Sequence, residues 1–334
     1  MPERIKSHSD PRLKNAYEAA LSQHGGRPDV WGVDIGYRYD GTRMRPEDGL
    51  FVRVHVSPEV AASDPRAGTG QPPLAMAFSA AAIPDTLEGV PLVRIHAKYG
   101  KHHQVGGGTT ASDVHKRTVV VNPLRPGVQV AQQNGTGGTL GLIVVDLLSG
   151  EFSILSNEHV LQVAGVVNPT IVQPTFLAGG TPVATFTRAV GHPTGDAALA
   201  ALGNPTARPL SAVQFGTRVV VAGPDDVVVG DVVRKSGAAS GITDGVVDGI
   251  GRYRMADNES VGMDGFRIVA KPRNRDISKP GDSGAVWFRK SDHKGVGLHV
   301  GGDITVTDPV LRPAIAAHLP AVLQALNAAI RPVP

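Results

Sequence analysis

Two hydrophobic periods alternate in the first hundred residues. Directly after Asp10-Pro11, a pair suited to the cap and first turn of a helix, apolar side chains recur every three to four positions. The apolar positions of this predicted helix, which Gly25-Gly26 ends, are Leu13, Ala16, Tyr17, Ala20 and Leu21. Alternating or continuous apolar runs then predict strands over residues 31–39, 50–56 and 92–95. Residues 1–99 are therefore expected to form a small α/β accessory domain.

From residue 128 onward, short valine-rich runs alternate with glycine and proline. The chain contains 41 glycines and 26 prolines, a composition typical of a turn-rich β protein. Helical spacing returns only near the end, over residues 320–330. The apolar positions there are Leu319, Val322, Leu323, Leu326 and Ile330. The pattern predicts a mostly β protein with a C-terminal helix, either docked on the preceding strands or available to an oligomer interface.

Residues 100–127, between these two regions, are rich in glycine and histidine. His102, His103 and His115 are side chains that a metal site could use. Because the chain has no cysteine and only Asp113 offers a carboxylate nearby, a linker is favoured over a metal site. We expect no metal and no cofactor.

The stretch 279–288, Lys-Pro-Gly-Asp-Ser-Gly-Ala-Val-Trp-Phe, has the form of a tight turn followed by an apolar strand. Gly281 and Gly284 allow the backbone to turn sharply, so the amides of Gly281 and Ser283 can point into one small space. Two such donors stabilise the oxyanion of an acyl-transfer reaction, and removing one costs about 3–4 kcal/mol. Ser283 is therefore a candidate nucleophile, and the alternative is an ordinary tight turn.

A base and an orienting acid are available earlier in the chain. His159 follows the predicted strand 152–155 and precedes apolar residues, so a scaffold can hold its ring towards a cleft. Asp196 opens the apolar run 197–201, where burial of a carboxylate without a partner would be costly and an imidazole is a suitable partner. The alternative is that Asp196 only caps the turn after residues 193–195.

The segments "GTGGTLG…LSNEHVL", "GDAALAAL" and "PGDSGAVWF" occur in the order His159, Asp196, Ser283. With these motifs the chain resembles the trypsin-like serine proteases of the chymotrypsin fold, and the order differs from those of subtilisins and α/β-hydrolases. The resemblance implies two β-barrels, over residues 128–210 and 211–334. It implies that Ser283 attacks a peptide bond, that His159 transfers the proton, and that Asp196 orients the imidazole.

The accessory region carries a resemblance of its own. Its segments "GVDIGYR…VRVHV…IPDTLEGVPLVRI" are similar to the N-terminal module of intracellular trypsin-like proteases related to the plant narrow-leaf protein. No residue of this region suggests chemistry, so a role in oligomerisation or substrate delivery is expected.

The resemblance also points to a pocket for the substrate side chain before the scissile bond, lined by Ile277, Ser278, His299 and Gly301. Ile277 stands where trypsin carries an aspartate, which disfavours a preference for basic residues. Ser278 with His299 resembles the pocket of bacterial glutamyl endopeptidases, which implies a preference for acidic residues. The alternative is that His299 faces a neighbouring strand and the pocket is apolar.

The composition and net charge of the chain narrow its expected cellular location and its expected partners. There is no cysteine, no apolar signal core at the N-terminus and no run long enough to span a membrane, so a bacterial, cytoplasmic protein is expected. A formal net charge of +3 without a basic block argues against nucleic acid as a partner. Expected partners are protein or peptide substrates and further copies of the chain. Alternatives to an active endopeptidase are an HtrA-like quality-control protease and a catalytically inactive or latent scaffold that binds proteins.

Overall fold

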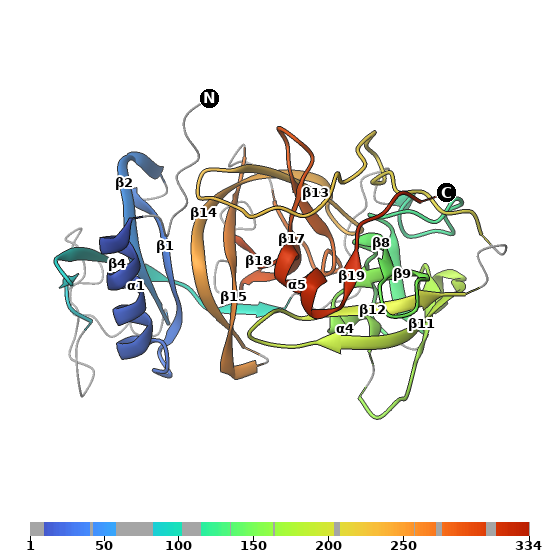
Figure 1. The fold of residues 1–334 in the computed structure, drawn as a ribbon, viewed down its shortest axis with the longest axis horizontal. Coiled ribbons are helices and arrows are strands. Elements are labelled where there is room, and N and C mark those ends of the chain that lie inside the picture. Colours follow the sequence, from blue (N-terminus) through green and yellow to red (C-terminus); the bar gives the residue numbers. More distant parts are fainter. Residues whose placement is uncertain are drawn as a thin grey trace.

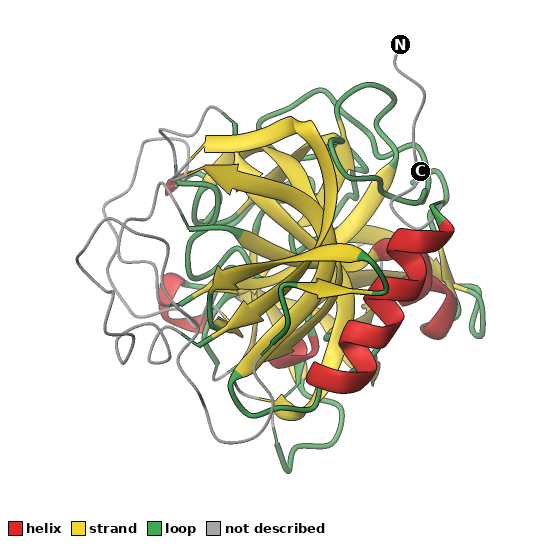
Figure 2. Cartoon of the chain, turned by 90° about the vertical axis from the view of Figure 1, so that its left-hand side faces the viewer, coloured by secondary structure: helices red, strands yellow, loops and turns green. Residues whose placement is uncertain are grey.

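A computed structural model describes residues 10–40, 43–57, 83–101, 115–133, 135–162, 164–203, 208–256, 258–271, 276–304 and 312–333. The histidines at 102 and 103 lie outside these residues. The helices are α1 (Pro11–His24), α4 (Glu158–Leu161), α5 (Leu319–Ala325) and the 3-10 turn η1 (Phe176–Ala178). The strands form an eight-stranded and an eleven-stranded sheet. Figure 2 shows that strands make up most of the molecule, with few helices beside and among them.

The eight-stranded sheet forms the first barrel, with the strand order β19-β8-β9-β12-β11-β10-β6-β7. Its strands are β6 (Gln129–Gln132), β7 (Gly138–Thr139), β8 (Leu142–Asp146), β9 (Phe152–Ser156), β10 (Thr170–Gln173), β11 (Thr181–Val190), β12 (Ala197–Leu202) and β19 (Ala328–Ala329). β7 pairs with β6 and continues through Leu140 and Gly141 into β8, which closes the ring. Buried side chains such as Val130, Ile154 and Ile171 fill its interior.

The second barrel lies in the eleven-stranded sheet. Its strands are β13 (Val232–Gly237), β14 (Gly241–Met255), β15 (Asn258–Ala270), β16 (Val286–Arg289), β17 (Gly295–Asp303) and β18 (Ala314–His318). They pair in the order β13-β16-β17-β18-β15-β14, and β14 pairs back with β13, so the ring is closed. The expected mostly β fold with two barrels is confirmed.

The accessory region extends the second barrel. It consists of α1, β1 (Val30–Asp40), β2 (Arg43–Val56), β3 (Thr86–Leu87) and β4 (Val90–His96). β1 pairs antiparallel with β14, from Gly32 opposite Tyr253 to Gly36 opposite Gly249, so one sheet runs from the barrel into this region (Figure 1). The expected helix is confirmed as α1, whose Asp10 carboxylate accepts the Arg12 N–H at 2.8 Å. The boundaries at residues 99, 127 and 210 stay predictions.

The C-terminal helix is shorter than expected. α5 ends at Ala325, and Asn327 follows with φ 46°, a left-handed conformation that a helix cannot continue. The chain then forms β19, which pairs with β8 of the first barrel. The apolar side chains of α5 are buried between the two barrels, as docking on the strands requires. No helix of the described residues is long and apolar enough to cross a membrane.

One further strand, β5 (Tyr99–Lys101), lies where the sequence predicts the start of a linker. It pairs antiparallel with β17 and in parallel with β14. The carbonyl of Tyr99 accepts the Ala256 N–H at 2.8 Å, and the carbonyl of Lys98 accepts the Ile304 N–H at 2.9 Å. The first residues of this segment are therefore part of the folded barrel.

Candidate active site

The three candidate catalytic residues come from three different elements. His159 lies on the single turn α4, which continues from β9 of the first barrel. Asp196 immediately precedes β12, which pairs with β9. Ser283 lies on the turn that leads into β16 of the second barrel. The pairing of β9 with β12 brings the histidine and the aspartate together.

His159 and Asp196 make two contacts. The imidazole Nδ1 lies 2.6 Å from Asp196 Oδ2, and the backbone N–H of His159 donates to Oδ1 at 3.2 Å. Asn157 supports the same turn by donating its side-chain amide to the Asp196 carbonyl at 2.5 Å. Together these contacts fix the orientation of the imidazole relative to the carboxylate.

Asp196 is ionised. Its side chain is only 2% exposed, and burial alone would raise its pKa. The hydrogen bond and charge of His159, together with the charge of Lys101, outweigh burial and hold the pKa of this carboxyl well below its usual range. An ionised carboxylate on Nδ1 leaves Nε2 as the nitrogen that can accept a proton from a nucleophile.

Lys101 is a site residue that the sequence did not predict. Its Nζ lies 2.9 Å from Asp196 Oδ2, the oxygen that also contacts His159. Lys101 is the last residue of β5, the short strand that pairs with β17 and β14 of the second barrel. No local pattern indicates this contact, because the pairing of β5 with β17 alone brings the lysine there.

The turn with Ser283 lies against the first barrel. Thr139 of β7 donates its backbone N–H to the Ser283 carbonyl at 2.7 Å. The approach requires glycine: a Cβ on Gly138 would lie 2.4 Å from Val160 and 2.9 Å from the Ser283 carbonyl oxygen. A Cβ on Gly284, whose φ is +90°, would lie 2.1 Å from the Ser156 hydroxyl. Ser283 thus lies at the junction that carries His159, and their direct contact stays a prediction.

The two candidate oxyanion donors lie on a constrained backbone. Gly281 has a φ of +100°, and its carbonyl accepts the Thr139 hydroxyl at 2.9 Å, which turns that carbonyl towards the first barrel. Within the described part of the chain, neither the Gly281 nor the Ser283 amide donates a hydrogen bond. Both N–H groups are therefore available to an acceptor, as an oxyanion hole requires.

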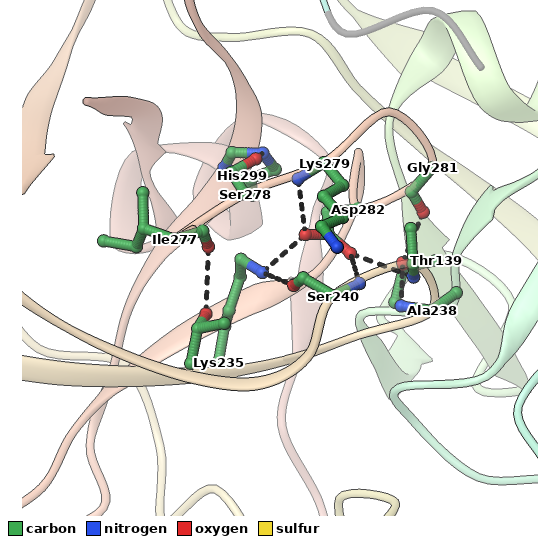
Figure 3. A network of polar contacts seen from close by, with 12 residues as sticks. Thr139, Lys235, Ala238, Ser240, Ile277, Ser278, Lys279, Gly281, Asp282 and His299 are labelled. Atoms are coloured by element: carbon green, nitrogen blue, oxygen red, sulfur yellow. Dashed lines mark hydrogen bonds and ion pairs between the residues drawn. The ribbon is translucent and has the colours of Figure 1, made fainter. Parts of the chain in front are cut away.

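A buried ion pair supports this turn from below (Figure 3). Asp282 Oδ2 lies 2.7 Å from the Nζ of Lys235, and both side chains are fully buried. The carboxylate also accepts backbone N–H groups from Lys279 at 3.0 Å, Ala239 at 3.0 Å and Ser240 at 2.9 Å. Burial would raise the pKa of Asp282, but the charge of Lys235 holds it well below the usual range.

These buried contacts of Asp282 hold the nucleophile turn in shape. Lys235, the partner of Asp282 47 residues earlier, was missed. The available signal was a lysine inside the valine-rich strand β13, directly before a serine and a glycine. A cation in such a strand is buried only when a carboxylate is present to receive it.

Of the four predicted pocket residues, Ser278 and His299 form a hydrogen bond with each other. Ser278 Oγ lies 2.6 Å from His299 Nε2, both side chains are buried, and the rings of Trp287 and His299 pack in a T-shaped arrangement. Ile277 instead belongs to the hydrophobic core of the second barrel, and Figure 3 shows its side chain pointing away from Ser278 and His299. Gly301 is covered by β5. Contact of these residues with a substrate stays a prediction.

No protein-family model and no curated protein matches the chain. Solved structures that resemble it are serine proteases of the chymotrypsin fold. A glutamic-acid-specific serine protease that uses a histidine triad in substrate binding is 18% identical, with a TM-score of 0.49, over 62% of this chain and 100% of that one. Thermobifida fusca protease A (16%, TM-score 0.47, 62% and 98%) and Cellulomonas bogoriensis chymotrypsin (19%, 0.46, 62% and 99%) are similarly distant. At this distance, function has to be argued from the site.

Proposed function

We propose that this protein is a serine endopeptidase that hydrolyses peptide bonds in protein or peptide substrates. The observation that carries the proposal is the pairing of His159 with ionised Asp196 at the junction where the Gly-Asp-Ser-Gly turn meets the first barrel. A base, its orienting acid, a hydroxyl and two amides that donate to no other described residue are the groups that acyl transfer needs.

In this mechanism Ser283 Oγ attacks the peptide carbonyl while His159 Nε2 takes its proton. Asp196 holds the Nδ1–H and stabilises the imidazolium that forms. The amides of Gly281 and Ser283 bind the carbonyl oxygen as it becomes negative. His159 returns the proton to the leaving amine, and water, activated by the same imidazole, then hydrolyses the acyl-enzyme and regenerates Ser283.

The Lys235–Asp282 pair makes the turn independent of cleavage at a distant N-terminus. In secreted trypsin-type enzymes, the aspartate next to the nucleophile pairs with a newly formed N-terminus. Here a lysine of the same barrel supplies the cation at 2.7 Å. The nucleophile turn therefore takes its shape when the barrel folds.

A preference for an acidic residue before the scissile bond is the finer part of the proposal. Ser278 Oγ and His299 Nε2 share a hydrogen bond of 2.6 Å, and a protonated His299 would attract a carboxylate. A pocket in which the serine satisfies a neutral His299 would favour apolar residues instead. Cleavage of a peptide library separates the two, and strong cleavage after arginine or lysine would contradict both.

The alternatives differ in chemistry or origin. A scaffold that binds proteins without cleaving them would keep the barrels and leave Ser283 unreactive. Kinship with the narrow-leaf type of protease, a bacterial origin and a cytoplasmic location stay predictions that rest on sequence motifs and composition.

The test is covalent labelling of the full-length chain by a fluorophosphonate, read by intact mass. We expect one adduct on Ser283, none in Ser283→Ala, and a decrease in peptide turnover of about 10⁴-fold or more in His159→Ala. Ser149→Ala is the matched control, because Ser149 is an exposed serine in the turn between β8 and β9. Labelling that persists in Ser283→Ala would overturn the proposal.

A further inference from the structure

β5 pairs with β17 directly beside the candidate nucleophile. The pairs are Lys101 with Gly301, Gly100 with Gly302, and Tyr99 with Asp303. The opposite edge of β17 at the same residues is taken by β18, which pairs through Ile315 and Ala314. β5 therefore occupies the remaining edge of β17.

This edge leads to the reacting atoms. The carbonyl of Val300, one residue before the β5 pairing, lies 3.5 Å from Ser283 Oγ. An extended peptide that adds as an antiparallel strand to residues 301–303 has its backbone hydrogen bonds supplied by β17 and is directed towards Ser283. β5 lies in that position with that orientation.

The fit between β5 and β17 leaves no room for a second strand. A Cβ at Gly301 would lie 2.1 Å from the carbonyl oxygen of Gly100 and 3.1 Å from the Cα of Lys101. The two backbones touch, so a substrate strand and β5 cannot occupy this edge together.

Through Lys101, β5 also contacts the candidate catalytic residues. Its Nζ contacts Asp196 Oδ2 at 2.9 Å, and its side chain is 16% exposed. A cation on this carboxylate offsets the negative charge that would otherwise stabilise the His159 imidazolium. The strand therefore covers the substrate edge and also weakens the base.

Strands β1 and β2 of the accessory region anchor β5. Tyr99 is fully buried, and its hydroxyl lies 2.6 Å from His55 Nδ1. His55 in turn lies 3.1 Å from Asp34 Oδ2, and Asp34 also binds Arg53. His55, Asp34 and Arg53 all belong to β1 and β2, so the accessory region and the active-site edge are joined through Tyr99.

We propose that β5 is an intramolecular substrate mimic: it occupies the peptide-binding edge of β17, and the protein rests in a self-inhibited state until this strand leaves. The inference deepens the proposed endopeptidase function and rests on it. A tethered strand competes at an effective concentration on the order of millimolar, so an external peptide gains access only when β5 is released or outcompeted. Strands β1 and β2 of the accessory region hold Tyr99, so their movement would release β5.

A reversible crosslink tests the proposal, because the chain contains no cysteine of its own. Gly100 and Gly302 are directly opposed across the β5–β17 pair, and a Cβ on Gly100 would point towards Ile304, on the Gly302 side. In Gly100→Cys/Gly302→Cys, the oxidised form should cleave fluorescein-labelled casein about tenfold or more slowly than the same protein after reduction. Intact mass verifies the disulfide.

Release of the strand is the second arm. Lys101→Met keeps the length of the side chain and removes the cation, so casein cleavage should rise about tenfold above wild type. Lys98→Met is the matched control, since the Lys98 ammonium lies over the Trp31 ring, 4.8 Å from its centroid, and its variant should match wild type. This arm decides the matter if the double variant does not fold.

The outcomes separate the two proposals. Equal rates for the oxidised and reduced double variant, or a Lys101→Met rate at or below wild type, would overturn self-inhibition while the endopeptidase stands. Absence of fluorophosphonate labelling on Ser283 in wild type, in Lys101→Met and in the reduced double variant would overturn the endopeptidase, and self-inhibition with it.

Discussion

Two buried aspartates flank the candidate nucleophile, and they are held differently. Asp282 receives one ammonium and three backbone amides, all from the barrel to which it belongs. Asp196 receives the imidazole of its own barrel and the ammonium of Lys101, which comes from β5. Burial raises the pKa of both carboxyls, and a larger opposing effect lowers it: chiefly the hydrogen bond of His159 at Asp196 and chiefly the charge of Lys235 at Asp282.

The difference lies in which partner can leave. Lys235 cannot move away from Asp282 without opening the second barrel, so that pair is a fixed support for the turn. Lys101 can leave Asp196 when a three-residue strand peels from β17, and Asp196 then keeps His159. One carboxylate therefore holds structure, and the other is placed to respond to what occupies the cleft.

The largest effect is expected from Lys235→Met. Loss of the ammonium leaves a fully buried carboxylate without a cation, which should lower the free energy of unfolding by about 3–5 kcal/mol. Urea denaturation followed by circular dichroism measures it. In the control Lys290→Met, an ammonium that is 39% exposed leaves Asp244, and the cost should stay within about 1 kcal/mol. Equal costs for both variants would show that Asp282 is held by its amides alone.

Acid should weaken the fold through the same groups. Asp196 and Asp282 have folded pKa values below the ordinary 3.8, so the unfolded chain binds more protons between the folded and unfolded values. Their contribution to stability is complete above about pH 5 and is lost progressively as pH falls below it, by at most about 1.4 kcal/mol per pH unit for each group. Asp282→Asn should flatten the decrease in the free energy of unfolding between pH 4 and pH 2.5. An unchanged acid profile in that variant would contradict this account of Asp282.

How much of the fold and of the site could be predicted from the sequence depends on how far apart along the chain the determining residues lie. α1 and the mostly β character of the chain follow from local periods and glycine corners. The two barrels follow only from the family resemblance, which the short motifs around His159, Asp196 and Ser283 carry. The length of the C-terminal helix was wrong because Asn327 turns the chain into a strand whose partner, β8, lies in the other barrel.

Local sequence patterns could not predict that Lys235 and Lys101 are the partners of the two aspartates. Lys235 meets Asp282 because β13 pairs with β16, and Lys101 meets Asp196 because β5 pairs with β17. A strand of three residues has no period to detect, and its glycine-rich surroundings favour a linker. Pairing between distant strands, which sets both contacts, is fixed only by the complete fold.

Tyr99→Phe tests the anchor of β5 and should have an intermediate effect. Removal of the hydroxyl leaves the buried Nδ1 of His55 without this partner, which should cost about 1–3 kcal/mol of unfolding free energy. Casein cleavage should rise at the same time, because β5 is held less firmly. Tyr37→Phe, at a half-buried tyrosine of β1, is the control. It should change the free energy of unfolding by no more than about 1 kcal/mol and the rate of casein cleavage by no more than about fivefold. A destabilised Tyr99→Phe with unchanged cleavage would separate the anchor from inhibition.

Lys101→Met should have the smallest effect on stability. The substitution is the same as at Lys235 and also removes a cation from a buried aspartate, but Asp196 keeps the His159 contact at 2.6 Å, and the lysine side chain is partly exposed. The free energy of unfolding should therefore fall by no more than about 1 kcal/mol in urea denaturation at pH 7. A loss of 3 kcal/mol or more, as expected at Lys235, would mean that Lys101 is also a fixed support. β5 would then be a permanent strand of the barrel, and its departure from β17 would require unfolding.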